Sequence, residues 1–185
     1  MSDPPAVRGP SVLSVPDGDN RERMICPDCG FINYENPKIV VGSVCVWEER
    51  FLLCRRAINP RRGYWTLPAG YLELQESTPA GAIREAWEEA QARIVIDGLL
   101  AIYDIPRISQ VQIMYRAHLA APEFAAGPES LDVRLFAWDE IPWDDLAFPS
   151  VRWALSQYRA ALDAEGTMRA DYSVQANPPG DAGDY

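Results

Sequence analysis

The sequence predicts an α/β (α+β) fold in which a mixed β-sheet carries helices packed on its faces. Two observations lead to this prediction. Segments of β-branched and aliphatic residues alternate with two amphipathic helical patterns along the middle of the chain. The 185 residues, of which 48% are hydrophobic, also suffice for one globular domain with a substantial core. The expected order of elements is β-β-β-α-β-β-β-α.

Six segments are expected to form strands. The first two are joined by a short polar turn, and the third leads into Pro68. Two further segments have the apolar periodicity of amphipathic helices. The expected strands are 38–47, 51–57, 64–67, 93–103, 110–119 and 133–138, and the expected helices are 78–91 and 150–164.

The two ends of the chain lack this patterning. Residues 1–22 are rich in Pro, Ser, Asp and Gly, so we expect a flexible leader there. Residues 166–185 have a similar character and are expected to form a flexible tail. Between the ends we expect a short cysteine-containing segment at 23–37 and the main domain at 38–165.

Composition restricts the class of partner. The net charge of −10 argues against a sequence-independent grip on nucleic acid, which requires clustered Lys and Arg. No apolar stretch approaches the length of a membrane span, and the N-terminus has no signal-peptide core. We therefore expect a soluble cytoplasmic protein with reduced cysteines that binds neither nucleic acid nor membrane.

The 78–91 helix has recognisable start signals. Ser77 or Thr78 is expected as its N-cap, and Pro79 occupies a tolerated first-turn position. At 100° per residue, one side of the helix gathers apolar residues, and this face is expected to enter the core. The residues of this face are Ala80, Ile83, Trp87 and Ala90.

Three glutamates, Glu85, Glu88 and Glu89, project from the opposite side of this helix. Like charges at this spacing each destabilise a helix by about 0.2–0.5 kcal/mol, so the three carboxylates call for a cation. A solvated acidic face, partly relieved by Arg84, is the alternative for the helix considered alone. The preceding strand, however, ends in a Pro and Gly turn that brings backbone carbonyls past the start of the helix. Carboxylate and carbonyl oxygens together are the ligands that Mg²⁺ prefers.

The helix and the turn before it form one pattern, Gly-x5-Glu-x7-Arg-Glu-x2-Glu-Glu. Six fixed residues over twenty positions, in a strand-loop-helix context, make a specific signal. This pattern resembles the Nudix box, and the mixed sheet sandwiched between helices that the resemblance implies agrees with the alternation above. The six residues are Gly70, Glu76, Arg84, Glu85, Glu88 and Glu89.

The resemblance implies a metal site. The three helix glutamates would hold one to three Mg²⁺ ions, with Mn²⁺ as a substitute, and the backbone carbonyl of Ala69 would complete the site. Arg84 would orient the glutamates and pair with Glu76. One departure from the family pattern is Gln91, which stands where a glycine is usual and would need a different helix exit.

The chemistry of such a site is metal-assisted hydrolysis of a phosphoanhydride. The general base is left open between Glu88, Glu89 and a carboxylate outside the box. Glu129 and Asp132 are the candidates outside it, because relatives often place a further acidic residue in this region. Solvated loop acids are the alternative for both.

Two residues near the box are expected to contact substrate. Arg55, at the end of a strand, would meet phosphates, and Trp65 would stack a nucleobase. Arg56, Arg61 and Arg62 are further candidates for the phosphates. A surface arginine and a core tryptophan are the alternative interpretations.

A wider resemblance concerns the runs ICPDCGFINYENPKIVVGSV and YWTLPAGYLE, which are similar to a Nudix subgroup with an N-terminal zinc ribbon. A structural zinc needs four ligands, and only one CxxC pair, Cys26 and Cys29, is present. We therefore expect a degenerate ribbon without zinc. A zinc site shared between two subunits is the alternative.

The predicted function is Mg²⁺-dependent hydrolysis of the pyrophosphate bond of a nucleoside diphosphate derivative. The subgroup is linked to hydrolysis of FAD and ADP-ribose, so the expected substrate is one of these small nucleotides. A pyrophosphatase that sanitises the nucleoside triphosphate pool would use the same helix. A non-catalytic nucleotide-sensing module is the alternative from another class, but the intact box carboxylates favour an enzyme. A homodimer is expected by analogy with relatives.

Overall fold

The computed structural model describes residues 9–162 and 166–178. The chain divides into two compact units, residues 1–37 and residues 38–185. In the described residues, no helix has the length and apolar character needed to cross a membrane.

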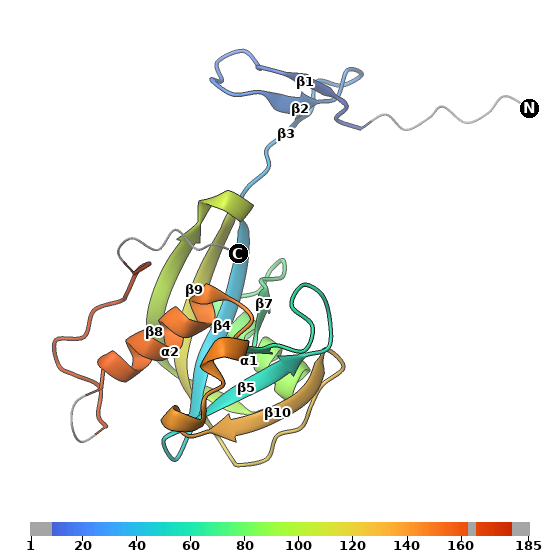
Figure 1. The fold of residues 1–185 in the computed structure, drawn as a ribbon. Coiled ribbons are helices and arrows are strands. Elements are labelled where there is room, and N and C mark those ends of the chain that lie inside the picture. The colour runs from blue at the N-terminus through green and yellow to red at the C-terminus, as the bar shows by residue number, and fades with distance from the viewer. Residues whose placement is uncertain (1–8, 163–165, 179–185) are drawn as a thin grey trace, which may run out of the picture. The chain divides into compact units, whose positions relative to one another are not determined.

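The N-terminal unit contains a small antiparallel sheet in the order β1-β2-β3 (Figure 1). The CxxC turn connects β2 to β3, and the Cys26 N–H donates to the Phe31 carbonyl at 2.8 Å. Gly30 closes this turn with a φ of +73°, a conformation that glycine adopts without steric cost. The strands are β1 (Val12–Ser14), β2 (Arg23–Ile25) and β3 (Ile32–Asn33).

The structure therefore differs from the flexible leader expected over residues 1–22. Strand β1 lies inside this range and pairs with β2, Leu13 opposite Met24. The turn between the two strands is fixed by Asp19, whose carboxylate accepts from Arg23 at 3.0 Å. Three-residue strands are too short to show a period, so composition alone could not reveal them. Residues 1–8 lie outside the described residues.

The second unit is built on a mixed sheet in the order β10-β5-β4-β9-β8 (Figure 1). Strands β4 and β9 are parallel and the other pairs are antiparallel. Two short strands extend the sheet, β6 beside β5 and β7 beside β4. The bounds are β4 (Lys38–Trp47), β5 (Arg50–Arg56), β6 (Trp65–Thr66), β7 (Ala69–Tyr71), β8 (Ile94–Ile105), β9 (Gln110–Leu119) and β10 (Ser130–Phe136).

Helix α1 (Thr78–Ala90) and helix α2 (Pro149–Ala160) cover opposite faces of this sheet, one behind it and one in front in Figure 1. Alternate residues of β4 show the two faces, because Val44 packs in a cluster with Leu155 of α2 and Cys45 packs with Ala86 of α1. The predicted α+β class with a sandwiched mixed sheet is confirmed. Short 3-10 helices occupy Pro106–Ile108, Trp138–Glu140 and Trp143–Asp145.

The predicted core face of α1 was correct at Ala90 and wrong at its other three positions. Ile83 and Trp87 are 41% and 50% exposed, whereas smaller residues and two glutamates are buried. The helix lies too close to β4 for large side chains, since a Cβ added at Gly81 would stand 2.7 Å from Val41 Cγ2. The buried residues of α1 are Gly81, Ala82, Glu85, Ala86, Glu89 and Ala90.

The flexible tail expected from residue 166 also differs from the structure. Tyr172 packs against the core cluster on the α2 face, and its hydroxyl donates to the Leu100 carbonyl. The Ile102 N–H donates to the Gln175 carbonyl at 3.0 Å, which pairs this segment with β8. Polar composition concealed these contacts because backbone groups make most of them. Residues 163–165, which include the expected end of the 150–164 helix, and residues 179–185 lie outside the described part of the chain.

Candidate active site

Helix α1 is placed by defined caps at both ends. The Ser77 hydroxyl accepts from the Ala80 N–H at 3.4 Å, as expected for the N-cap. Gln91 adopts the left-handed conformation, with φ of 47°; its N–H donates to the Trp87 carbonyl, and the Ala92 N–H donates to the Ala86 carbonyl. The lack of glycine was expected to change how this helix ends. The helix nevertheless ends in the left-handed conformation that is usual for glycine, and this conformation costs Gln91 some backbone strain.

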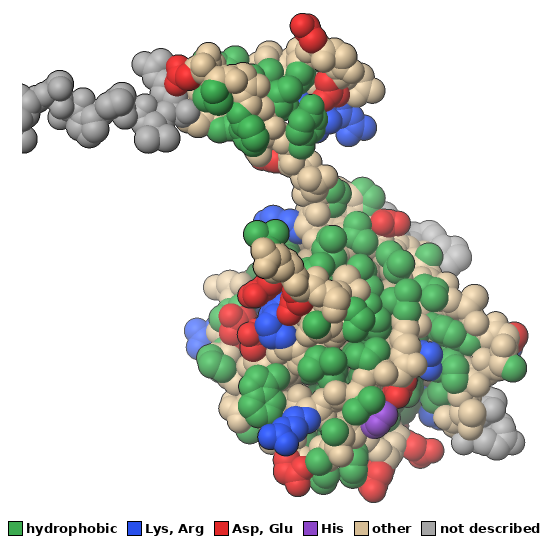
Figure 2. Space-filling view, turned by 180° about the vertical axis from the view of Figure 1, so that it is seen from behind, with side chains coloured by type: hydrophobic (Ala, Val, Ile, Leu, Met, Phe, Trp, Pro, Cys, Tyr) green, Lys and Arg blue, Asp and Glu red, His purple; other side chains and the backbone are tan. Residues whose placement is uncertain are grey.

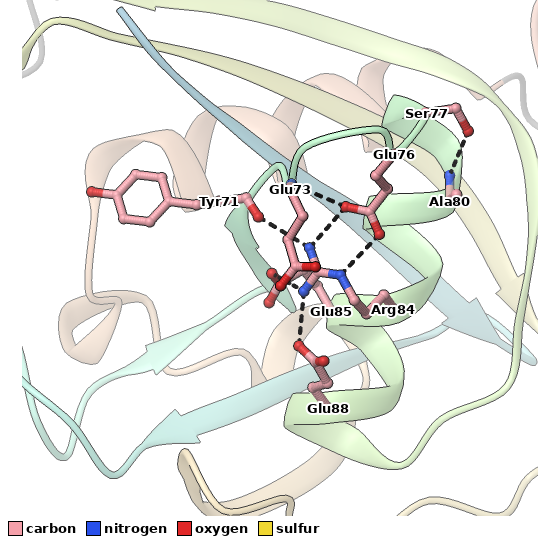
Figure 3. Close-up of polar contacts among 8 residues, drawn as sticks. All are labelled: Tyr71, Glu73, Glu76, Ser77, Ala80, Arg84, Glu85 and Glu88. Atoms are coloured by element: carbon pink, nitrogen blue, oxygen red, sulfur yellow. Dashed lines mark hydrogen bonds and ion pairs between the residues drawn. The ribbon is translucent and has the colours of Figure 1, made fainter.

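Arg84 gathers the charged side chains around α1 (Figure 3). Its Nε and Nη2 donate to the two carboxylate oxygens of Glu76 at 2.9 and 3.0 Å. Its Nη1 donates to Glu85 at 2.7 Å and to Glu88 at 2.8 Å. The hydrogen bonds from Arg84 hold the pKa of Glu76 below its usual value. One guanidinium therefore brings together three carboxylates that are spread over thirteen residues of sequence.

Glu89 lies deeper than the other box glutamates. Its side chain is buried, and one carboxylate oxygen accepts from the Ala69 N–H at 3.1 Å. Burial raises its pKa to about 8, and the neighbouring Glu85 adds to this effect. Burial also raises the pKa of Glu85, against the opposing influence of Arg84. Both acids are therefore held in a place where an additional positive charge would be stabilising.

The raised pKa of Glu89 predicts an unusual pH dependence of stability in the presence of EDTA. Between pH 4.5 and about 8 the folded chain retains a proton that the unfolded chain has lost, so the free energy of unfolding should fall as pH rises. Glu89→Gln, which cannot ionise, should show a flatter dependence. Urea unfolding at pH 5, 6.5 and 8 measures this difference, and parallel curves for the two proteins would contradict it.

Gly70 makes room for the Glu85 carboxylate. A Cβ at Gly70 would lie 2.3 Å from Glu85 Oε1 and 2.4 Å from Oε2, closer than non-bonded atoms approach. A side chain at position 70 would therefore displace the Glu85 carboxylate from this place. Since Gly70 belongs to β7, which pairs with β4, the sheet itself sets the position of this carboxylate.

The carboxylates line a large cavity in the second unit. Its volume is about 1430 Å³, above the roughly 300–1,000 Å³ usual for small-ligand sites. Glu85, Glu88 and Glu89 form part of its wall, together with Glu129 from the loop before β10. Figure 2 shows acidic side chains gathered around a basic one on the face of the molecule that carries α1. Glu129 thus lines the same cavity as the box glutamates, and its catalytic role stays a prediction.

Three other sequence candidates lie away from the cavity wall. Arg55 is exposed and donates to the Gly63 carbonyl at 2.8 Å. Asp132 lies opposite Arg55 in the register of β10 and β5 and forms an ion pair with Arg134 at 2.7 Å. Trp65 is buried against Phe136, with ring centroids 4.9 Å apart, so it follows its alternative interpretation as a core residue.

Arg56 takes the place that Arg55 was expected to fill. It lines the cavity, its Nε donates to the Pro60 carbonyl at 2.8 Å, and its guanidinium lies 5.2 Å from the centre of the Phe148 ring. Its charge also lowers the pKa of Glu89. Adjacent residues of a strand point to opposite faces of the sheet. Assigning the two faces of β5 from the sequence would therefore have shown that only one of the two arginines can face the cavity.

The donor set suits a hard divalent cation. Carboxylate oxygens line the cavity, and burial raises the pKa of two of these acids, Glu85 and Glu89, which a nearby cation would counteract. Among the described residues, no three acidic, thiol or imidazole groups are already gathered around one point. Arg84 instead occupies the space between Glu85 and Glu88, so an ion there would replace part of its contact.

Comparison with known proteins identifies the family. A family model described as the NUDIX domain matches residues 36–156, and one described as Nudix N-terminal, a zinc ribbon, matches residues 9–35. The chain belongs to the Nudix family. The predicted resemblance to its zinc-ribbon subgroup is confirmed, and so is the prediction of a Nudix enzyme.

Solved and curated Nudix proteins are similar to this chain over different lengths. A NUDIX hydrolase of known structure from Nitrosomonas europaea is 44% identical, with a TM-score of 0.82, over 96% of this chain and 100% of that one. A MutT-like protein from Streptomyces ambofaciens is 34% identical over 55% of this chain and 64% of its own length. An ADP-ribose pyrophosphatase from Methanocaldococcus jannaschii is 26% identical over 59% of this chain and 67% of its own length. This chain thus spans about two thirds of both curated relatives.

Proposed function

We propose that this chain catalyses Mg²⁺-dependent hydrolysis of the pyrophosphate bond of a nucleoside diphosphate derivative, either ADP-ribose or FAD. The observation that carries the proposal is the position of the box carboxylates. Glu85, Glu88 and Glu89 lie in the wall of one large cavity, and Arg84 holds two of them in place.

The residues that would hold Mg²⁺ are the three glutamates and the backbone carbonyl of Ala69. Mg²⁺ bound there would neutralise diphosphate oxygens and lower the pKa of a bound water. The hydrogen bond from the Ala69 N–H to the Glu89 carboxylate supports this choice, because it holds residue 69 next to that glutamate. Mn²⁺ has similar ligand preferences and is expected to substitute.

The cavity offers further side chains for the substrate and for proton transfer. Arg56 would bind a phosphate, since it lines the same cavity as the carboxylates and its planar guanidinium suits phosphate oxygens. The proton acceptor is one of Glu88, Glu89 and Glu129, which all line the cavity. Asp132 is not part of this proposal, because its carboxylate pairs with Arg134 outside the cavity.

Cavity size supports a dinucleotide-like substrate. The volume of about 1430 Å³ leaves room for groups on both sides of a diphosphate. A curated relative named as an ADP-ribose pyrophosphatase adds support for this class. The N-terminal unit supplies only Cys26 and Cys29 as thiol ligands, so we propose that it folds without a zinc ion of its own.

A substrate panel tests the proposal. The purified chain, incubated with ADP-ribose, FAD, NADH and oxidised nucleoside triphosphates, should cleave ADP-ribose or FAD into two monophosphates with Mg²⁺ present. EDTA should abolish turnover, and added Mg²⁺ should restore it, because the carboxylates alone cannot neutralise a diphosphate.

Chromatography of the products distinguishes the alternatives. Release of inorganic pyrophosphate from a triphosphate, with no cleavage of the diphosphates, would assign the chain to nucleotide-pool sanitation. Tight binding of nucleotides without any cleavage would indicate a sensing module instead. Either result would overturn the proposed substrate class.

A further inference from the structure

One end of the cavity, beyond the carboxylates, carries a chain of neutral polar side chains. Gln112 Nε2 donates to Gln110 Oε1 at 3.4 Å, and Gln110 Nε2 donates to the Tyr71 hydroxyl at 3.3 Å. All three residues line the cavity, and none of them is charged. The Nudix box and the metal chemistry use none of these side chains.

Gln112 is the most informative of these three hydrogen-bonded side chains. Its exposed fraction is 9%, yet the bond to Gln110 is the one hydrogen bond that its side chain makes within the described residues. A glutamine amide carries two N–H donors and an oxygen that accepts two bonds, and buried amides are normally satisfied. The rest of this amide is therefore available to a ligand in the cavity.

The strand register gives the distance from this end to the carboxylates. Gln112 and Tyr71 both lie opposite Val40, whereas Ala69, which contacts Glu89, lies opposite Gly42. The two rows are two residues apart, or about 7 Å along the strands, and Gln112 and Ala69 lie on strands that flank β4 on either side, about 10 Å apart across the sheet. A group next to Gln112 would therefore lie about 12 Å from the backbone of Ala69, a distance that the ribose and base of a nucleotide together span from a diphosphate held at the carboxylates.

Tyr71 supplies an aromatic surface beside the two amides. In Figure 3 its ring extends away from the cluster of Arg84 and the glutamates, while its carbonyl oxygen accepts from Arg84 at 3.0 Å. The ring is 53% exposed, and the Lys38 ammonium lies 5.3 Å from its centre. Half-exposed aromatic rings offer a face for stacking another ring.

We propose that Tyr71, Gln110 and Gln112 form a subsite that recognises the adenine of the substrate. An amide presents a donor and an acceptor side by side, which matches the amino group and adjacent ring nitrogen of adenine. Guanine presents two acceptors on the corresponding edge and is better matched by Arg or Lys. This inference deepens the proposed function and rests on it, because the diphosphate must lie at the carboxylates.

Binding of product-like fragments tests the subsite. Isothermal calorimetry on the full chain would compare AMP, GMP and ribose 5-phosphate, the last of which has no base. We expect wild-type protein to bind AMP more tightly than either of the others. Gln112→Leu, of similar size, should weaken AMP binding about tenfold and leave ribose 5-phosphate binding as it was, because only base contacts are lost.

Two further variants provide a second test of the subsite and a matched control. Gln110→Leu removes a neighbouring amide at a less buried position, and it should weaken AMP binding in the same direction even if Gln112→Leu fails to fold by circular dichroism. His118→Gln is the matched control, because His118 lies on the same strand, β9, bonds to Asp97 and does not line the cavity. It should bind AMP like wild type.

The outcomes separate the subsite from the proposed function. Wild-type AMP affinity in both glutamine variants, equal loss of AMP and ribose 5-phosphate binding, or GMP binding as tight as AMP would overturn the subsite. Base-dependent AMP binding without any cleavage of ADP-ribose or FAD would retain the subsite and overturn the function. Cleavage of ADP-ribose with an unchanged KM in both variants would do the reverse.

Discussion

Replacing Glu89 by Gln should lower kcat by about a thousandfold, equivalent to about 4 kcal/mol in the activation free energy. Glu89 is buried and its carboxylate is crowded by that of Glu85, so its negative charge is the feature that favours a cation at this place. The amide of glutamine keeps the shape and one oxygen but loses this charge. Steady-state hydrolysis of ADP-ribose at saturating Mg²⁺, with the AMP formed quantified by chromatography, measures the loss.

Asp132→Asn is the matched control for this experiment. Asp132 is also an acid near the site in sequence, but the structure pairs it with Arg134 outside the cavity. It should retain wild-type turnover within about twofold. A Glu89→Gln variant as active as Asp132→Asn would remove the basis of the proposed metal site, provided that thermal melts show both proteins folded.

Gly127→Ala should destabilise the chain by at least about 3 kcal/mol and abolish activity with it. A Cβ on Gly127 would stand 1.7 Å from the carbonyl oxygen of Glu88, and backbone cannot move aside as a flexible side chain does. The Gly127 N–H also donates to the Glu89 carbonyl at 3.0 Å. The added methyl group would thus separate the 120–129 loop from the end of α1 that carries these two glutamates. Urea denaturation followed by circular dichroism gives the free energy of unfolding.

Gly63→Ala provides the comparison for this substitution. Gly63 has a φ of +89°, but no atom lies within 4 Å of an added Cβ. Its cost should therefore be backbone strain alone, about 1 kcal/mol. If Gly127→Ala were no more destabilising than Gly63→Ala, the close packing of the loop on α1 would not contribute as the structure implies.

Much of the fold followed from local patterns in the sequence. β4 was predicted over residues 38–47 because a long run of β-branched residues has few other interpretations, and the structure has the same bounds. The start of α1 followed from Ser77, whose hydroxyl satisfies a helix N–H in any tertiary setting. The contacts of Arg84 with Glu76 and Glu85 came from the family resemblance, since spacing alone does not reveal how a loop returns to a helix.

The remaining differences arise from packing that sequence does not display. Hydrophobicity assigned Ile83 and Trp87 to the core, but the distance between α1 and β4 admits only small side chains there. Arg55 and Arg56 are adjacent residues of the same type, and only the orientation of β5 determines which one faces the cavity. Gln112 lies in a strand of ordinary appearance, so its place in the cavity emerges only when β9 is set beside β4.

Glycine and alanine residues pack α1 against the sheet, so the residues on the solvent side of the helix are not needed to hold it in place. A residue such as Ile83 takes no part in that anchoring, although it is apolar and occupies the middle of the element. Substitution of Ile83 would change the surface that the helix exposes to solvent, while the buried carboxylates of the same helix would keep their positions. The exposed residues of this thirteen-residue helix can therefore be substituted while its buried residues stay unchanged.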